Sequence, residues 1–182
     1  GRFALVHDDD PIRYLADVWP VDELAQASVT VVGVGSIGGS IAESLATAGV
    51  GHLSLVDPDR ILRHNLPRHR LSEESLGRFK ARALAEVIPA RYPSTRATPF
   101  VFDVADDADL MRPLFARSDL VVCASDGVLS RRVANHLARR ARIPLVLAAV
   151  LENGAVGEVV RVQPGTGCLW CMRRTLVEQG VF

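Results

Sequence analysis

Residues 28–49 read SVTVVGVGSIGGSIAESLATAG, and this stretch determines the fold. Its first residues are apolar and β-branched, as in a buried strand, and its last ten place apolar residues at helical spacing before a glycine. Between them, Gly33, Gly35 and Gly38 form a G-x-G-x-x-G turn that leads into the helix at Ser36. The first glycine permits a tight turn, the second lets a phosphate approach the backbone, and the third lets the helix pack on the strand. We predict a nucleotide-binding strand, turn and helix; the alternative is a glycine-rich turn that binds nothing.

Strands and helices alternate along the rest of the chain. Strand-like runs occur at residues 52–57, 97–102, 118–124, 143–150 and 155–162, and helical segments at 77–92, 106–116 and 129–141. Helices of about 10 to 15 residues between strands imply right-handed crossovers. We therefore expect an α/β fold, a doubly wound, mostly parallel Rossmann-like sheet with helices on both faces. Residues 1–27 are a lead-in with one or two short helices, and 58–75 are a long loop of the kind that usually carries function.

The composition is that of one ordinary globular domain. The 182 residues are 48% hydrophobic, and 21 basic side chains balance 21 acidic ones. Since proteins that bind nucleic acids or anionic membranes usually carry a basic excess, neither partner is expected. The longest apolar stretch, near residues 145–151, is too short to span a bilayer, and the N-terminus lacks a secretory signal pattern. A cytoplasmic protein is therefore expected.

An acidic side chain follows the second strand. Asp57 lies 19 residues beyond Gly38, and Asp59 follows it after a proline. A carboxylate at this place in a dinucleotide-binding fold accepts hydrogen bonds from ribose hydroxyls. Taken with the glycine turn alone, this spacing is typical of an NAD-binding domain. The alternative is that Asp57 only caps a turn.

Polar and basic residues come next: Asn65, Arg68 and then Lys80, the single lysine among the 21 basic residues. A triphosphate carries more charge than a diphosphate bridge, so its binding requires more cations. Asn65, Arg68 and Lys80 beside a ribose-binding acid therefore indicate a triphosphate clamp, which hydride transfer does not need. The alternative is a solvated basic loop, a description that fits the neighbouring Arg63, Arg70 and Arg78.

A second carboxylate, Asp126, follows the strand that ends near Cys123. The carboxyl ends of parallel strands meet at one edge of a sheet, so Asp126 is expected on the same edge as the glycine turn. A carboxylate that faces a triphosphate is a natural Mg²⁺ ligand. The alternative is that Asp126 caps the helix that starts near Leu129. Cys123, on an apolar strand, is expected in the core.

The order of these motifs resembles that of a known family. GVGSIGG, AGVGHLSLVDPD, NLPRH, the lysine in GRFKA, SDG with Arg131 and Asn135 behind it, and CLWC follow one another between residues 29 and 171. Together they resemble the adenylating domain of the ubiquitin-activating-enzyme (E1-like) superfamily, in the bacterial ThiF/MoeB type. In that family the C-terminal carboxylate of a small ubiquitin-like protein attacks the α-phosphate of ATP, which gives an acyl adenylate and pyrophosphate.

The resemblance implies a role for each site residue. ATP would lie on the turn formed by Gly33, Gly35, Ser36 and Gly38. Asp57 would hold the ribose with Asp59 beside it, Asn65, Arg68 and Lys80 would hold the phosphates, and Asp126 would hold Mg²⁺. Arg68, Lys80 and Asp126 would form the catalytic set: Arg68, Lys80 and the Mg²⁺ held by Asp126 would cancel the negative charge, and no side chain need act as a base because the attacking carboxylate is already ionised.

The sequence also departs from the family pattern. His69 stands where the family commonly has glutamine after Asn-Leu-x-Arg, and the N-terminal Arg-x-x-Arg-Gln pattern is absent, with Arg13 as the candidate for its arginine. The family binds one structural Zn²⁺ with two C-x-x-C pairs, but here only Cys168 and Cys171 form such a pair. We interpret them as half of a zinc site and the chain as part of a longer protein. The alternatives are vestigial cysteines or, less in keeping with their position, a redox pair.

The sequence-based prediction is thus an ATP-binding adenylation domain over residues 28–182. It activates the C-terminal carboxylate of a small ubiquitin-like protein or peptide, as a homodimer. The alternatives are a relative that modifies an antibiotic peptide, an NAD(P)-binding oxidoreductase, and a non-catalytic scaffold that keeps the fold and binds a partner through the same groove.

Overall fold

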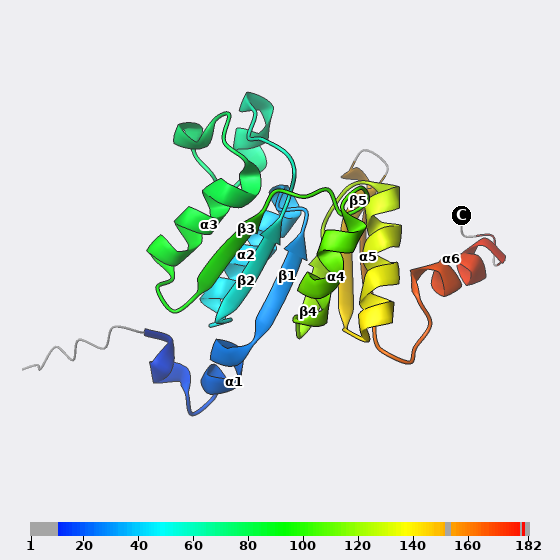
Figure 1. Ribbon diagram of the computed structural model, residues 1–182, viewed down its shortest axis with the longest axis horizontal. Coiled ribbons are helices and arrows are strands. Elements are labelled where there is room, and N and C mark those ends of the chain that lie inside the picture. Colours follow the sequence, from blue (N-terminus) through cyan, green and yellow to red (C-terminus); the bar gives the residue numbers. More distant parts are fainter. Residues whose placement is uncertain (1–10, 152–153, 179, 181–182) are drawn as a thin grey trace, which may run out of the picture.

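The computed structural model describes residues 11–151, 154–178 and 180 (Figure 1). Six strands form one sheet in the order β3-β2-β1-β4-β5-β6. All neighbours are parallel except β5 and β6, which are antiparallel. The strands are β1 (Ser28–Val32), β2 (His52–Val56), β3 (Arg96–Phe100), β4 (Leu120–Cys123), β5 (Leu145–Leu151) and β6 (Val156–Val162). The predicted doubly wound α/β fold is confirmed.

Helices connect the strands as the sequence predicts. The α-helices are α1 (Val21–Gln26), α2 (Ser36–Thr47), α3 (Lys80–Arg91), α4 (Ala108–Ala116), α5 (Val128–Ala141) and α6 (Leu169–Glu178). The 3₁₀ helices are η1 (Pro11–Leu15), η2 (Arg63–Arg68) and η3 (Glu73–Ser75). The described part of the lead-in therefore contains two short helices, η1 and α1, where one or two were expected. The predicted long loop is more ordered than the sequence suggests, because η2 and η3 lie within it, and α6 was not predicted.

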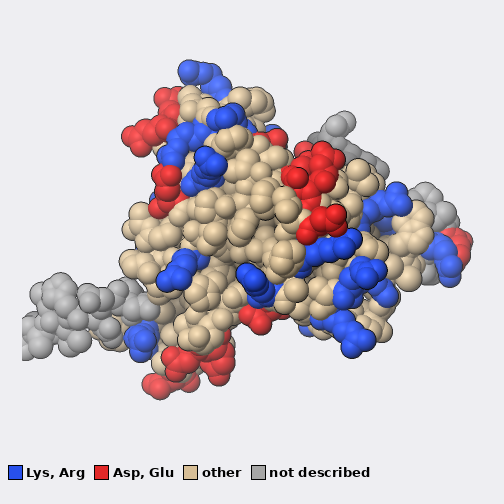
Figure 2. Space-filling view, in the orientation of Figure 1, with Lys and Arg blue, Asp and Glu red and all other residues tan. Residues whose placement is uncertain are grey.

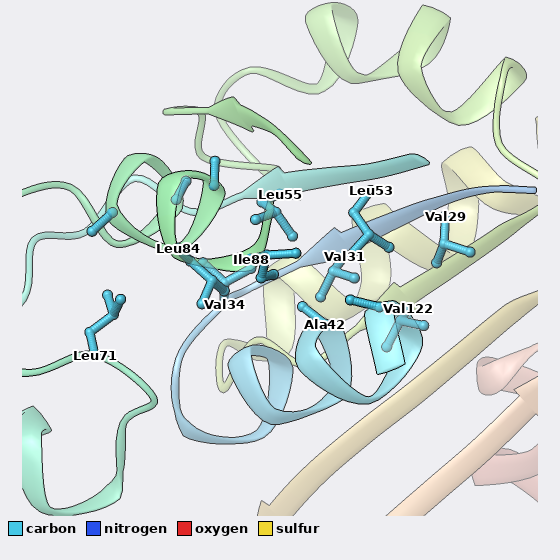
Figure 3. Close-up of a cluster of buried hydrophobic side chains, with 14 of the residues drawn as sticks. Val29, Val31, Val34, Ala42, Leu53, Leu55, Leu71, Leu84, Ile88 and Val122 are labelled. Carbon is cyan, nitrogen blue, oxygen red and sulfur yellow. The ribbon is translucent and has the colours of Figure 1, made fainter. Parts of the chain in front are cut away.

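Two apolar layers cover the two faces of the sheet. On one face, Val31 of β1 and Leu55 of β2 pack against Ala42 of α2 and Ile88 of α3 (Figure 3). On the other face, a second buried cluster joins the sheet to α4 and α5 and contains Phe115 and Cys123, both 0% exposed. Helices on both sides explain why the central strands are apolar runs rather than alternating ones. Cys123 is a core residue, as predicted.

The strand order reverses between β1 and β4, and polar groups join the amino ends of these two strands. The Thr30 and Ser118 hydroxyls lie 2.7 Å apart and buried, and the Ser28 amide donates to Asp119 Oδ2 at 2.8 Å. At the other end of the two strands the chain diverges toward opposite faces of the sheet. A crevice at the carboxyl ends follows from this topology, and open α/β sheets bind ligands there.

The surface carries charges of both signs. Figure 2 shows Lys and Arg side chains in several separate groups, interspersed with Asp and Glu. Within the part of the chain that the structure describes, no helix is both long enough and apolar enough to cross a bilayer.

Candidate functional site

A cleft of about 550 Å³ lies at the carboxyl ends of β1, β2 and β4. Gly33, Gly35 and Ser36 line it from the turn after β1. Asp126 lines it from the segment after β4. The segment after β2, which rises above the sheet in Figure 1, contributes Asp57, Asp59, Asn65, Arg68 and Lys80. Gly33 and Asp126, which are 93 positions apart in the chain, therefore line the same cleft.

The three glycines of the turn have three different surroundings. Gly33 has a φ of +78°, and a Cβ there would lie 2.8 Å from the Ser125 amide nitrogen. A Cβ on Gly38 would lie 1.8 Å from the Gly33 carbonyl oxygen, so this glycine lets α2 begin directly against the turn. A Cβ on Gly35 would meet nothing within 4 Å. Gly33 and Gly38 are thus required by packing, whereas Gly35 leaves open space in the cleft.

Asp57 fixes the glycine turn from the end of β2. The residue is only 4% exposed, and its carboxylate accepts hydrogen bonds from the Val34 amide at Oδ2 (2.8 Å) and from the Asp59 amide at Oδ1 (2.9 Å). Burial raises the pKa of Asp57, while Lys80, whose Nζ lies 4.0 Å from Oδ1, and the two amides oppose the rise. Asp57 thus holds the backbone through two hydrogen bonds, a structural role in addition to the predicted one of binding a ribose.

Lys80 is the first residue of α3, and its charge is directed toward the end of β2. Its Nζ donates to Asp59 Oδ2 at 2.7 Å, and its side chain is 11% exposed. An antiparallel bridge between Arg60 and Phe79, with the Arg60 guanidinium 3.8 Å from the Phe79 ring centroid, holds the start of the loop to the start of α3. Lys80 is therefore held at the cleft, next to Asp57, by acidic partners that a bound polyanion would have to displace.

The loop residues Asn65, Arg68 and His69 have different surroundings. Asn65 is buried, and its Oδ1 accepts the Leu62 amide at 2.9 Å, so its side-chain NH₂ remains to face a ligand. Arg68, at the end of η2, is exposed at the cleft. His69 Nε2 lies 3.0 Å from the Val34 carbonyl oxygen, and the Leu71 amide donates to its Nδ1 at 3.3 Å. His69 is thus a neutral imidazole that joins the loop to the glycine turn, and burial lowers its pKa.

Asp126 lies at the opposite side of the cleft, exposed at the start of the segment before α5. The N-cap of α5 is Gly127, and no side chain makes a capping hydrogen bond there. None of the residues that the structure describes hydrogen-bonds to the Asp126 carboxylate. The geometry therefore does not support the capping alternative, and the carboxylate is available at the cleft.

The remaining candidates lie outside the cleft. Cys168 and Cys171 lie at the start of α6 with their sulfur atoms 3.6 Å apart. Over the described ranges no cluster of three or more His, Cys, Asp or Glu side chains could hold a metal. Two thiols do not complete a four-ligand zinc site. Arg13 lies in η1, whose Ile12 packs near Gly49, past the far end of the twelve-residue α2 from the glycine turn.

Sequence reasoning missed part of the cleft lining. Phe102, Asp103 and Val104 after β3 line it, as do Ser130 of α5 and Ala149 and Val150 of β5. Position at the carboxyl end of β3 was the available signal for the first three. His69 was noted as a departure from the family, but its bonds to the turn could not be read from the sequence.

Comparison with known proteins agrees with this geometry. The model of the ThiF family matches residues 10–181. The chain belongs to the ThiF family. Molybdopterin-synthase adenylyltransferase of Escherichia coli is 33% identical over 169 residues, which cover 88% of this chain and 67% of that protein. The SAMP-activating enzyme E1 of Haloferax volcanii is 32% identical over 158 residues, which cover 86% of this chain and 57% of that protein.

Solved structures of similar proteins lead to the same class. The crystal structure of E. coli MccB with ATP matches this ThiF-family chain with a TM-score of 0.74 and 27% identity, over 88% of this chain and 48% of the MccB chain. The chain thus spans half to two thirds of the length of these relatives. The chain is of the ThiF/MoeB adenylyltransferase type. The activity and substrate of the whole protein are proposed below.

Proposed function

We propose that this protein catalyses ATP- and Mg²⁺-dependent adenylylation of the C-terminal carboxylate of a small ubiquitin-like protein or peptide, with release of pyrophosphate. The observation that carries the proposal is the single cleft in which the glycine turn, Asp57, Arg68, Lys80 and Asp126 meet. An NAD-binding domain would need the first two features only.

The residues of the cleft suit ATP. The open space at Gly35 lets phosphate reach the backbone at the N-terminus of α2, where N–H groups and the helix dipole favour an anion. Asp57 lies at the end of β2, where a carboxylate of this fold accepts hydrogen bonds from the ribose hydroxyls. Lys80, Arg68 and the free NH₂ of Asn65 supply cationic and polar donors for the phosphates. On nucleotide binding, Lys80 would exchange part of its pairing with Asp59 for a phosphate.

The donor set at Asp126 suits Mg²⁺. This ion takes one or two carboxylates together with phosphate oxygens and water, so one exposed carboxylate opposite the phosphate-binding turn is sufficient. When bound, the metal would neutralise phosphate charge and stabilise the leaving pyrophosphate. Asp126 would hold it, and no other described residue is required as a ligand.

The chemistry needs charge cancellation and positioning. An oxygen of the substrate carboxylate forms a bond to the α-phosphorus of ATP, and the bond from that phosphorus to the bridging oxygen breaks, so that pyrophosphate leaves with the electron pair. Arg68 and Lys80 lower the repulsion between the attacking carboxylate and the triphosphate. The attacking group is already ionised, so no base is required.

The relatives support a carboxylate on a small protein or peptide. One is named for activating SAMP and another for acting on molybdopterin synthase, and MccB has been solved with the peptide MccA. We extend this substrate class, but no single substrate, to the present chain. Residues 1–27 would be a lead-in and 28–182 the ATP-binding domain of a cytoplasmic protein. A second cysteine pair from outside this chain would complete the zinc site of Cys168 and Cys171.

A homodimer would complete the site. Arg13 lies past the far end of α2, which is about 18 Å long at 1.5 Å per residue, so it does not reach the cleft of its own chain. In a homodimer, the second copy would bring its arginine to this cleft. The sheet offers an exposed apolar face for such a contact, since Val150 and Val159 are 56% and 77% exposed.

Calorimetric titration with ATP plus Mg²⁺ and, separately, with NAD⁺ tests the proposal. We expect ATP to bind the wild-type chain, and Asp57→Ala and Arg68→Ala to weaken binding at least about tenfold through loss of the ribose and phosphate contacts. Arg63→Ala is the matched control, because Arg63 is an exposed arginine of the same short helix that does not line the cleft. Binding of NAD⁺ alone would contradict the proposal. If the chain binds ATP but shows no pyrophosphate exchange in the presence of a carboxylate substrate, the result would favour the alternative of a non-catalytic scaffold.

A further inference from the structure

A buried arginine, Arg131, lies directly behind the segment that carries Asp126. It belongs to the first turn of α5 and is only 5% exposed. Its Nη2 donates to the Asp126 carbonyl oxygen at 3.3 Å, and its Nε donates to the Gly127 carbonyl oxygen at 3.4 Å. One planar guanidinium therefore contacts two successive backbone carbonyls.

Glu158 of β6 anchors this guanidinium from the other side. Arg131 Nη1 lies 3.5 Å from Glu158 Oε2, and Arg173 Nη2 of α6 donates to the same oxygen at 3.1 Å. The Glu158 side chain is 17% exposed, so solvent screens these pairs only in part. The position of Arg131 is thus fixed by Glu158 of the sheet, which Arg173 of α6 also binds, and both lie outside the segment that Arg131 holds.

The Asp126 segment depends on this contact for its geometry. The start of α5 has no side-chain cap, and none of the described residues hydrogen-bonds to the Asp126 carboxylate. The location of that carboxylate at the cleft is therefore set by the backbone that carries it, and Arg131 binds that backbone. A lysine would keep the charge opposite Glu158 but cannot contact two carbonyls and a carboxylate with one rigid fork.

We propose that Arg131 is a positioning residue for metal binding, which holds the Asp126 carboxylate toward the phosphates without touching substrate. This inference rests on the proposed role of Asp126 as the Mg²⁺ ligand. A structural arginine would only stabilise the fold, and apolar replacement of a buried ion pair is often tolerated. A positioning arginine would change the response to Mg²⁺ specifically, since loss of a group that orients a metal ligand typically costs 10-fold to 100-fold in metal affinity.

The experiment is calorimetric titration of the full chain with ATP, in EDTA and over a series of MgCl₂ concentrations. For Arg131→Lys we expect ATP affinity in EDTA within about twofold of wild type and a half-saturating Mg²⁺ concentration raised at least about tenfold. Arg132→Lys is the matched control, because Arg132 is the next residue of α5 and lies over the Trp170 ring instead. Its Mg²⁺ response should equal that of wild type.

The outcomes separate this inference from the proposed function. A wild-type chain whose ATP affinity does not respond to Mg²⁺ would refute the metal role of Asp126 itself. If Asp126→Asn removes the response and Arg131→Lys leaves it unchanged, only the inference fails. It also fails if Arg131→Lys weakens ATP binding equally with and without Mg²⁺. Should Arg131→Lys not fold, Glu158→Gln decides: it keeps the side-chain volume and should raise the Mg²⁺ requirement, and an unchanged requirement would overturn the inference.

Discussion

His69 joins two parts of the cleft through both nitrogens of its ring. The Leu71 amide donates to Nδ1 while Nε2–H donates to the Val34 carbonyl. A second ring proton, on Nδ1, would therefore point at the N–H group of Leu71. Burial lowers the pKa of His69 below the ordinary imidazole value. The unfolded chain therefore takes up this proton more readily than the folded chain. The contribution of the neutral His69 ring to the unfolding free energy is therefore fully present above about pH 6.5. It is lost as the pH falls through the lowered pKa of the folded state.

Replacement of His69 by glutamine tests this pH dependence. An amide can donate to one backbone group and accept from the other without titrating, so His69→Gln should flatten the fall in unfolding free energy between about pH 7.5 and pH 5. Urea unfolding at several pH values measures the slope. His64→Gln, at an exposed histidine of η2, should leave the wild-type slope unchanged. Equal slopes in all three proteins would show that His69 does not couple protonation to folding.

Two glycines of one turn should respond differently to the same methyl group. A Cβ on Gly38 would collide with the Gly33 carbonyl, so Gly38→Ala should lower the unfolding free energy by about 1 to 3 kcal/mol. A Cβ on Gly35 enters open cleft, so Gly35→Ala should keep stability within about 0.5 kcal/mol but weaken ATP binding about tenfold or more. Thermal unfolding and calorimetry distinguish the two effects. A Gly35→Ala chain with wild-type ATP affinity would remove this turn from the nucleotide site.

At the scale of elements, α4 packs on the sheet through Met111 and Phe115, both fully buried. Phe115 is fully buried in the second apolar layer, whereas Leu110 of the same helix is 54% exposed. Phe115→Ala should therefore cost about 3 to 5 kcal/mol of unfolding free energy, because it leaves a cavity. Leu110→Ala should cost less than about 1 kcal/mol. Equal losses in urea unfolding would mean that α4 does not depend on this side chain.

The elements themselves could be predicted from the sequence with good accuracy. The glycine turn has its spacing of glycines, the central strands are apolar runs and the crossover helices have a helical apolar period, and the structure has each of them. The loop of residues 58–75 was harder to predict, because η2 and η3 are stabilised by individual contacts that leave no periodic pattern in the sequence. One is the bond between Asn65 and the Leu62 amide, and another is the bridge between Arg60 and Phe79.

The residues of the candidate site could be predicted in part from the sequence, but their partners could not. Asp57, Lys80 and Asp126 line one cleft, as residues at the ends of parallel strands should. The sequence could not show that Asp57 also binds the Val34 amide, that Asp59 pairs with Lys80, or that Arg131 holds the Asp126 backbone. Such contacts join elements far apart in the chain, and their geometry depends on the finished packing.

At the scale of the whole molecule, the β5–β6 hairpin has an uncovered face. Leu147 packs toward α4 and α5, so its neighbours Ala148 and Val150 point to the opposite side, and Val159 pairs with Ala148 there. If this face joins two copies, Val159→Asp should weaken association at least about tenfold, because it buries an unpaired charge. Sedimentation velocity measures the change. Leu110→Asp, on the surface of α4, is the control and should sediment as wild type, and a wild-type chain that is monomeric at all concentrations would contradict the dimer.

The bonds between the amino ends of β1 and β4 have a consequence for the order of folding. Thr30 and Ser118, which form one of them, are 88 residues apart in the chain. The glycine turn, Asp57 and Lys80 come from the earlier part, and Asp126 enters the cleft only when β4 docks beside β1. Closing so long a loop is slow compared with forming local structure. During synthesis on the ribosome, the groups proposed to bind the ribose and phosphates would therefore emerge and assemble first, and Asp126, the proposed metal ligand, would join them later.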